Sequence, residues 1–414
     1  MRHPAHHIFE FTPETLREWC GQRGMPAFRA AQILEWVYQR GVSEPALMSN
    51  LARRDRETLA RAMTFLSGCA VRHQRATDGT QKLLIQWDGE GTMHGQPHAT
   101  PAAAPEQAPA SVLGPHAGPP APAGSHALPL LAASSLADTS RQTECVMIPV
   151  HADDGTVLRA TACISSQVGC PVGCRFCASG VGGLEGNLSA GRIVEQVWRL
   201  ARLPEVERIT NVVFMGMGEP LANLRAVVHA VRTLAAPWGL GIGGRRITIS
   251  TVGLPQAIRR LAAELDVPVT LALSLHAPTD ELRRRLIPWA EYTTIAELLA
   301  ACQEWFEKTG REITLEYTLL REVNDRPEHA AELARLARTL RANVNLIRYN
   351  EVAGMPFARP GTDDVRRFQE VLRGRGVNAH IRRSRGRDIA AACGQLRHEA
   401  GAVGTAAAGT DAAR

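Results

Sequence analysis

The stretch "CPVGCRFC" (residues 170–177) places three cysteines with three and then two residues between them. It follows "TVLRATACIS", whose β-rich pattern predicts a strand, so we expect the thiols in a loop at the C-terminal end of that strand. Three thiols this close together indicate a bound metal centre. The number three matters, because most such centres use four ligands.

Zinc and iron–sulfur centres make different demands on the chain. A structural zinc site takes four ligands in paired knuckles, and no second Cys/His pair at that spacing occurs in the sequence. Cys163 could be a fourth ligand only if it bent back from the predicted strand. An iron–sulfur cube normally takes four thiolates, and when only three hold it, one iron keeps an open position. The spacing therefore favours a three-cysteine iron–sulfur cluster, with zinc as the alternative.

From about residue 156, short β-rich runs alternate with amphipathic helical stretches. In "SAGRIVEQVWRLARL", for example, Ile193, Val197 and Leu200 share one helical face. Repeated strand-then-helix units predict an α/β fold with a parallel sheet, and six or so units predict a full or partial (βα) barrel. Functional residues of such barrels lie at the C-terminal ends of the strands. The runs are "TVLRATACIS", "ITNVVFMG", "RITIST", "VTLALSLH", "EITLEYTLL", "NVNLIRYN" and "NAHIRR".

Glycine-rich or polar motifs stand where several of these strands should end. "FMGMGEP" carries Gly216 and Gly218, which would let the backbone approach a ligand closely. Its Glu219 could accept hydrogen bonds from an ammonium or hydroxyl group. "SLHAP" ends the run "VTLAL", and "YN" ends "NVNLIR". Each motif alone is also explained by an ordinary turn or a structural side chain, but together they predict one functional rim.

The 414 residues exceed one average domain, and the composition changes along the chain. Residues 11–66 read as helices, with a Thr cap in "TPETLREWC" and a plausible C-cap at Gly41, whereas "QKLLIQWDG" alternates like a strand. Residues 97–129 hold nine prolines and ten alanines but one acid and no base, which predicts a flexible insertion. The C-terminal "GAVGTAAAGTDAAR" predicts a disordered tail.

Cysteine use and the N-terminal residues bear on the compartment. The nine cysteines are odd in number and clustered, which favours metal or thiol chemistry over a disulfide framework. "MRHPAHHIFEFTPETLREW" has no apolar signal region, and no run approaches membrane-spanning length. We therefore expect a cytoplasmic protein without membrane association.

The positive charge is almost entirely arginine. The net charge is +6, and the only lysines are Lys82 and Lys308. The densest arginine cluster is "RGRGVNAHIRRSRGRD" (residues 373–388). Arginine binds phosphate in a bidentate manner, so this segment is either a solvated basic face or a binding site for RNA or phosphate.

The three-cysteine loop, followed by "GMGEP" after the second strand, resembles the radical S-adenosylmethionine (SAM) superfamily. The surrounding sequence is similar to the RlmN family of RNA adenine-C2 methyltransferases over most of residues 11–90 and 142–397. The motifs that carry this similarity are "CISSQVGCPVGCRFCASG", "ITNVVFMGMGEPL", "RRITISTVG", "LALSLHAP", "NLIRYN" and "RGRDIAAACGQL". The Pro/Ala-rich insertion has no counterpart in the family's pattern.

The resemblance implies a partial (βα)6 radical-SAM barrel with a small N-terminal helical accessory domain. The expected division is a helical RNA-binding domain (1–70), a β-hairpin-like connector (71–92), the disordered insertion (93–141), the methyltransferase domain (142–397) and the disordered tail (398–414).

The resemblance also implies the cofactors, a [4Fe–4S] cluster and SAM. Cys170, Cys174 and Cys177 would ligate the cluster, and its open iron would bind the methionine end of SAM. Adenine C2 is an electron-poor carbon with no acidic proton, and a deoxyadenosyl radical from SAM avoids the need for a nucleophile. Gly218 and Glu219 match the family's contacts to the methionine amino group. The other matching SAM contacts are Ser250, Ser274, Leu275, His276 and Asn350.

Three further residues match the family's reacting groups. Cys393 in "AAACGQL" matches the cysteine that a first SAM methylates, and a radical from a second SAM then activates its methyl group for attack on the adenine. Cys163 matches the thiol that resolves the resulting RNA–protein adduct by forming a disulfide with Cys393. Glu144 in "ECVMIP" matches the general base that removes the C2 proton.

The implied partners are 23S rRNA, tRNA and an electron donor such as flavodoxin, and we expect a monomer. The helical domain, where Arg29 and Gln32 share a helix side, and the arginine-rich segment are expected to grip RNA. One alternative is a Cfr-like enzyme that methylates adenine C8. The alternative from another class is a zinc-bearing RNA-binding protein without catalysis.

Overall fold

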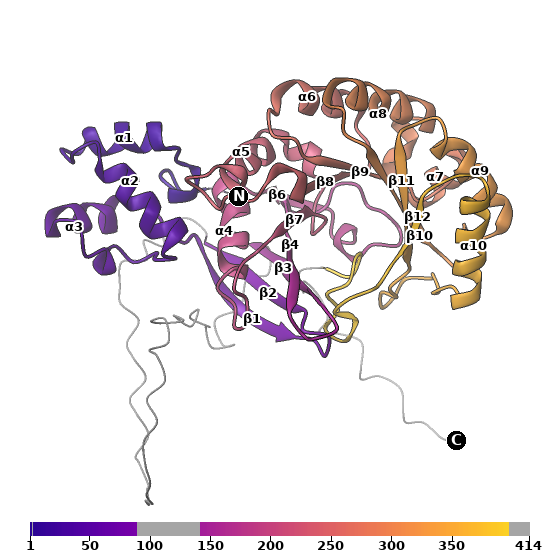
Figure 1. Ribbon diagram of the computed structural model, residues 1–414, viewed down its shortest axis with the longest axis horizontal. Coiled ribbons are helices and arrows are strands. Elements are labelled where there is room, and N and C mark those ends of the chain that lie inside the picture. The colour runs from indigo at the N-terminus through magenta and orange to yellow at the C-terminus, as the bar shows by residue number, and fades with distance from the viewer. Residues whose placement is uncertain (2, 89–140, 397–414) are drawn as a thin grey trace, which may run out of the picture.

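The computed structural model describes residue 1, residues 3–88 and residues 141–396. The predicted tail, and all of the predicted insertion except residue 141, lie outside the described residues. In the described part, one ten-stranded sheet forms the centre, and helices cover its outer face (Figure 1). None of the helices in these ranges is long and apolar enough to cross a bilayer.

Seven parallel strands make up most of this sheet. Six lie within predicted β-rich runs, and the seventh, β11, begins one residue before its run. Neighbouring strands pair in the order β4-β7-β8-β9-β10-β11-β12. Helices connect them in six crossovers, so the predicted α/β fold with a partial (βα)6 barrel is confirmed. The strands are β4 (Val157–Cys163), β7 (Asn211–Phe214), β8 (Ile247–Thr251), β9 (Thr270–Ser274), β10 (Ile313–Leu319), β11 (Ala342–Arg348) and β12 (Ala379–Arg382).

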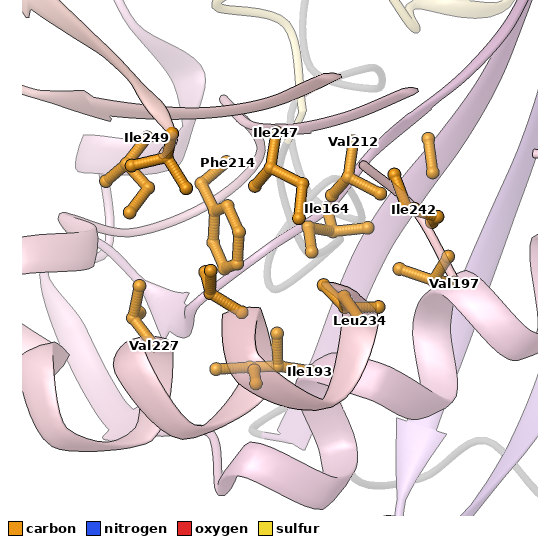
Figure 2. Packing of buried hydrophobic residues seen from close by; sticks show 14 of the residues in the cluster. Ile164, Ile193, Val197, Val212, Phe214, Val227, Leu234, Ile242, Ile247 and Ile249 are labelled. Carbon is orange, nitrogen blue, oxygen red and sulfur yellow. The ribbon is translucent and has the colours of Figure 1, made fainter. Parts of the chain in front are cut away.

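Helices pack on the outer face of the parallel strands. Figure 2 shows Val212, Phe214 and Ile247 pointing from the strands toward the helices. Ile193 on α4 (Ala190–Leu200), with Val227 and Leu234 on α5 (Leu224–Ala235), points back toward the strands and completes the apolar layer (Figure 2). The helices are α4 (Ala190–Leu200), α5 (Leu224–Ala235), α6 (Pro255–Glu264), α7 (Asp280–Leu286), α8 (Ile295–Thr309), α9 (Pro327–Ala337) and α10 (Thr362–Gly374).

Three antiparallel strands extend the sheet at its first edge. β1 (Gly68–Arg75) and β2 (Gln81–Trp87) form a hairpin, and β3 (Gln142–His151) joins β2 to β4. β2 coincides with the run "QKLLIQWDG", so that predicted strand is confirmed. β5 (Gln167–Gly169) and β6 (Leu184–Asn187) form a separate two-stranded sheet. The three-cysteine loop lies between these two strands in the sequence.

The N-terminal residues form short helices beside α4 (Figure 1). They are η1 (Ile8–Glu10), α1 (Pro13–Gly21), α2 (Arg29–Leu34), the π-helical turn η2 (Glu35–Gln39), η3 (Pro45–Leu47) and α3 (Arg53–Ala62). Thr12 caps α1 through its hydroxyl, as the sequence predicts, and Gly41 adopts φ = +71° just after η2. The indole of Trp198 on α4 donates a hydrogen bond to the Val37 carbonyl (2.9 Å).

Every residue of α4 is buried, because the barrel lies on one side of it and the N-terminal helices on the other. A charged residue on such a helix needs internal partners. The carboxylate of Glu195 accepts hydrogen bonds from the Ser67 amide (2.8 Å) and hydroxyl (2.9 Å), and it lies 3.1 Å from His7 Nε2. Arg199 pairs with its other oxygen at 2.7 Å. This network joins the N-terminal segment, the start of β1 and the barrel.

Glu195→Gln should lower the free energy of unfolding by about 3–5 kcal/mol, because it leaves Arg199 buried without its countercharge. Urea denaturation at neutral pH measures the loss. The control is Glu205→Gln, which removes a half-exposed ion pair with Arg75 and should cost at most about 1 kcal/mol. Equal losses in the two variants would contradict this prediction.

The same network predicts a pH dependence of stability. Burial alone would raise the pKa of Glu195, but Arg199, His7 and the Ser67 amide outweigh it and lower the pKa from 4.5 to about 2. Because the folded-state pKa lies below the unfolded-state value, the contribution is complete above about pH 4.5 and is lost as the pH falls toward 2. This contribution of Glu195 to the free energy of unfolding amounts to roughly 3 kcal/mol. The Glu195→Gln variant should therefore lack this part of the loss of stability at acidic pH.

Candidate active site

One cavity, open to solvent on one side, lies at the C-terminal ends of the parallel strands, where barrel geometry predicts function. The three-cysteine loop, the loop after β7, the ends of β8 to β11 and the segment around Cys393 all contribute to its wall. Of the residues predicted from the sequence, those that line it are Cys170, Cys174, Cys177, Gly218, Glu219, Ser250, Ser274, His276 and Cys393.

The three cysteines share one side of this cavity. Their thiols pack against a small apolar cluster that includes Phe176 and Tyr349. Burial raises the pKa of Cys170 to about 12 and raises the pKa of Cys174 and Cys177 above the ordinary thiol value. The thiols are therefore protonated near neutral pH unless a bound metal core supplies positive charge. Within the described ranges, no three His, Cys, Asp or Glu side chains surround a point that could hold a single metal ion.

The loop after β7 lies against the loop after β4, and two glycines make this contact possible. A Cβ at Gly216 would lie 2.7 Å from the Ile164 carbonyl carbon and oxygen. A Cβ at Gly218, which adopts φ = +100°, would lie 2.6 Å from the Gln167 Cβ. Any side chain at either position would therefore push the two loops apart. The glycines predicted for close backbone approach are required by the packing of the protein itself.

Glu219 is buried at the end of this loop. One carboxylate oxygen accepts a hydrogen bond from the Leu221 amide (2.9 Å) and the other from the Val252 amide (2.8 Å). Burial raises the pKa of Glu219, and these hydrogen bonds partly oppose the rise. The carboxylate is thus held rigidly beside the cavity. Ser250 and Ser274, on the adjacent strands β8 and β9, lie within hydrogen-bond distance of each other (3.1 Å).

His276 adopts the left-handed conformation (φ = +56°), which is uncommon outside glycine. Its Nδ1 accepts a hydrogen bond from the Thr318 amide (3.1 Å), and its carbonyl accepts one from Asn324 (2.8 Å). Burial, with a contribution from Arg283, lowers the pKa of His276 to about 3. The imidazole is therefore neutral and carries its proton on Nε2.

The segment around Cys393 is tied to the cysteine loop and to β11. The Ala178 amide donates to the Gly394 carbonyl (2.8 Å), and the Ser179 hydroxyl donates to the Leu396 carbonyl (2.5 Å). Asn350, just after β11, donates to the Cys393 carbonyl (3.2 Å). These bonds hold the Cys393 thiol at the cavity, where the residue is exposed.

Four predicted residues do not line the cavity. Leu275 is fully buried beneath it, and Asn350 bonds to the Cys393 backbone as described. Cys163 ends β4 in an apolar cluster that also contains Ala391, and burial and the neighbouring Cys393 raise its pKa. Glu144, on β3, forms a buried ion pair with Lys82. Cys163 and Glu144 therefore lie behind the segment around Cys393 and not at the surface of the cavity.

Glu316 also lines the cavity, although the sequence analysis did not select it. Its Oε1 accepts a hydrogen bond from Asn345 (2.9 Å), whereas its Oε2 is buried without a hydrogen-bond partner among the described residues. The available signal was a lone acid in the middle of the apolar run "EITLEYTLL". Glu316 pairs in register with Ser274, so it sits beside the predicted cofactor contacts.

The residues expected to grip RNA have different environments. Arg29 donates to Gln32 (2.7 Å) and pairs with Asp55 at 3.0 Å, so its guanidinium stabilises the accessory helices. In the arginine-rich segment, Arg373 donates to the Ala379 carbonyl. Arg383 and Arg387 are exposed on the same segment, which leads to Cys393.

Comparison with known proteins agrees with this geometry. The family model for the radical SAM superfamily matches residues 164–334, and the model for the ribosomal RNA large subunit methyltransferase N-terminal domain matches residues 6–64. A probable dual-specificity RNA methyltransferase RlmN of Symbiobacterium thermophilum is 43% identical over 94% of this chain and 90% of its own length. The dual-specificity RNA methyltransferase RlmN of Syntrophobacter fumaroxidans is 38% identical over 95% of this chain and 98% of its own length.

The chain belongs to the RlmN family. A crystal structure of a radical SAM methyltransferase from Sphaerobacter thermophilus is 38% identical and superposes with a TM-score of 0.78 over 95% of this chain and all of that chain. The RlmN assignment made from the sequence motifs is thereby confirmed, as is the radical SAM fold.

Membership of the RlmN family and the radical SAM superfamily implies a [4Fe–4S] cluster and SAM, and the residues of the cavity fit both groups. Three soft thiol ligands lie on one wall, which suits a cluster with one open iron. The backbone at Gly218 and the fixed Glu219 carboxylate lie on the same cavity, and a carboxylate suits the amino group of an amino acid. Hydroxyl groups of Ser250 and Ser274 can bond the polar parts of a nucleoside.

Proposed function

We propose that this chain, a radical SAM RNA methyltransferase by family, methylates C2 of an adenosine in 23S rRNA and in tRNA. The proposal rests mainly on one observation: the three-cysteine loop, the Gly218–Glu219 backbone and the Cys393 thiol share one cavity. The names of the curated relatives, dual-specificity RNA methyltransferases, support the two RNA substrates. We further propose that it acts in the cytoplasm as a monomer and takes electrons from a flavodoxin-like donor.

Cys170, Cys174 and Cys177 would hold the [4Fe–4S] cluster in this proposal, and the bound cluster would supply the electron that cleaves SAM. Gly218 and Glu219 bind the methionine end of SAM, while Ser250, Ser274 and His276 bind the rest of it. The neutral imidazole of His276 can donate from Nε2 because Nδ1 is occupied by the Thr318 amide. Leu275 and Asn350 act from behind the cavity wall, Leu275 by packing and Asn350 by fixing the Cys393 backbone.

Cys393 carries the methyl carbon to the RNA. Its sulfur would accept a methyl group from one SAM, and a second SAM would supply the radical that activates this methyl group, so that each turnover would use two SAM molecules. The activated carbon would bond to adenine C2, the oxidised cluster would take back the unpaired electron left on the ring, and Glu144 would accept the C2 proton, so that the RNA is held covalently through Cys393. The Cys163 thiol then gives up its proton as its sulfur attacks the Cys393 sulfur and forms a disulfide. The bond from that sulfur to the transferred carbon breaks with its electron pair going to carbon, which takes up a proton.

Nucleoside analysis tests the proposed function. The anaerobically reconstituted protein should convert adenosine to 2-methyladenosine in 23S rRNA fragments and in tRNA, as measured by mass spectrometry of digested RNA. Recovery of 8-methyladenosine would instead support the Cfr-like alternative. Absence of any methylated adenosine from a preparation that cleaves SAM would overturn the assigned RNA substrates.

Cys163→Ala should trap the RNA on the protein, because the adduct forms but its resolving thiol is missing. We expect a slower-migrating band that contains both labelled RNA and protein on denaturing gels, and methylated product lowered by on the order of 10²-fold or more. The control is Cys145→Ala on the neighbouring strand, which removes another buried thiol from the same sheet. Free methylated RNA at the wild-type rate from Cys163→Ala would contradict the assigned role.

A further inference from the structure

Lysine is nearly absent from this chain, and one of its two lysines is buried. Of the 47 basic residues, only Lys82 and Lys308 are lysine. Lys308 is exposed near the end of α8, where any cation would serve. Lys82 lies on β2, the second strand from one edge of the sheet, with its side chain only 7% exposed. A chain that otherwise uses arginine therefore keeps a primary amine at a largely buried position.

Lys82 connects two parts of the proposed site. Its Nζ lies 2.7 Å from Oε1 of Glu144 on β3 and donates a hydrogen bond to the carbonyl of Ala390 (3.3 Å). Ala390 lies three residues before Cys393 and adopts φ = +50°, an uncommon conformation for alanine. One ammonium group thus contacts both the proposed base and the segment that presents the reactive cysteine.

The hairpin that carries Lys82 holds this segment at further points. The Gly386 amide donates to Asp78 (3.0 Å), and the Thr77 amide donates to Asp388 (2.9 Å). Both bonds join the turn between β1 and β2 to residues just before Ala390. Lys82 is therefore the innermost of several contacts that fasten the Cys393 segment to the sheet.

An ammonium suits this place better than a guanidinium does. The lysine head is a compact charge with three donors, so it can bond a carboxylate and a carbonyl that face each other across a narrow gap. The planar fork of arginine is bulkier and favours two parallel bonds to one partner. This difference explains why the position departs from the arginine usage of the rest of the chain.

Other titratable groups lie around the pair. Cys145 follows Glu144 on β3, and its pKa is raised mainly by burial, with a contribution from Glu144. On β4, Cys163 pairs in register with Val146 of β3. On β1, Arg72 pairs in register with Leu84, which is the residue of β2 that pairs with Glu144. Neither buried thiol carries a charge near neutral pH, because burial raises the pKa of both.

We propose that Lys82 is a positioning residue for proton removal: it orients the Glu144 carboxylate, keeps it ionised until it accepts the adenine C2 proton, and couples it to the Cys393 segment. The inference rests on the role of Glu144 in the proposed function. In this step the proton moves to Glu144 while the electron pair of the C–H bond stays in the adenine ring. The ammonium, 2.7 Å from the carboxylate, favours the charged form of Glu144.

The test compares Lys82→Met with Lys308→Met, its exposed match. Lys82→Met should slow resolution of the RNA–protein adduct at neutral pH by about 10-fold or more and move the acidic limb of its pH profile to higher pH, by about one unit or more. Lys308→Met should behave as wild type. The pH profile separates an effect on Glu144 from a loss of packing, which would slow the reaction equally at every pH.

Two further variants complete the design. In a Glu144→Gln background, Lys82→Met should have no additional effect on adduct resolution, because its target is already absent. Lys82→Arg keeps the positive charge, so the acidic limb of its pH profile should stay near the wild-type position, although adduct resolution is slower. This variant is used if Lys82→Met yields too little folded protein. Wild-type kinetics in Lys82→Met, or additive losses in the double variant, would overturn the inference.

The outcomes also separate this inference from the proposed function. If Glu144→Gln resolves the adduct at the wild-type rate, the assignment of Glu144 as base fails, and with it the basis for Lys82. If Glu144→Gln stalls while Lys82→Met resolves normally across the pH range, only the role of Lys82 is lost.

Discussion

Cys393→Ala should abolish methylation of RNA, with product lowered by on the order of 10³-fold or more, because no other thiol of the cavity can carry the methyl carbon. The remaining cavity thiols, Cys170, Cys174 and Cys177, are assigned to the cluster. Cys393 is exposed at the cavity, so its truncation should leave the unfolding midpoint unchanged. The measurement is product formation in single-turnover reactions, with intact protein mass reporting whether a methyl group has been added.

Cys69→Ala is the matched control for this variant. Cys69 is a half-buried cysteine on β1, and it lies outside the cavity. It should keep wild-type methylation. Full turnover by Cys393→Ala would refute the covalent route altogether, and with it the roles assigned to Cys163 and Glu144.

Cys174→Ala should abolish iron binding and all cleavage of SAM. Cys174 is the middle cysteine of the loop, and two remaining thiolates cannot hold a cluster that the wild-type chain holds with three. After anaerobic reconstitution, we expect brown protein with absorption near 400 nm, roughly where iron–sulfur thiolates absorb, from the wild type and colourless protein from the variant. Iron analysis and detection of 5′-deoxyadenosine provide the quantitative readouts.

Cys393→Ala is the matched control in this experiment, because it removes a thiol from the same cavity that is not assigned to the cluster. It should keep its colour, its iron and its cleavage of SAM while it fails to methylate RNA. Loss of iron from both variants would contradict the division between ligand and methyl carrier. Retention of iron and SAM cleavage by Cys174→Ala would contradict the three-cysteine cluster itself.

The parallel strands could be predicted because their signals are local. Alternating or continuous runs of apolar residues, such as "VTLALSLH" and "NVNLIRYN", are separated by amphipathic stretches. That rhythm permits few topologies other than a parallel sheet covered by helices. Once the strands are parallel, their C-terminal ends meet at one edge. Motifs far apart in sequence, from Cys170 to His276, therefore had to meet around one cavity.

The contacts behind that cavity could not be predicted in this way. Lys82 and Ala390 are 308 residues apart, and their contact depends on how the β1–β2 hairpin extends the sheet and on where the chain returns after β12. The sequence pattern of neither segment indicates that the two segments are in contact. The same holds for the ion pair between Arg29 and Asp55, which the sequence pattern did not indicate.

The sequence by itself determined the strand–helix rhythm, the three thiols at the end of the first parallel strand and the family of the chain, because each depends on residues close together in the sequence or on motifs in fixed order. Only the tertiary structure decided which side chains surround the reacting groups. The positions of Glu316 in the cavity, of Glu195 on α4 facing His7, and of Lys82 beside Glu144 are each explained by burial, because a buried charged group needs partners wherever the fold brings them.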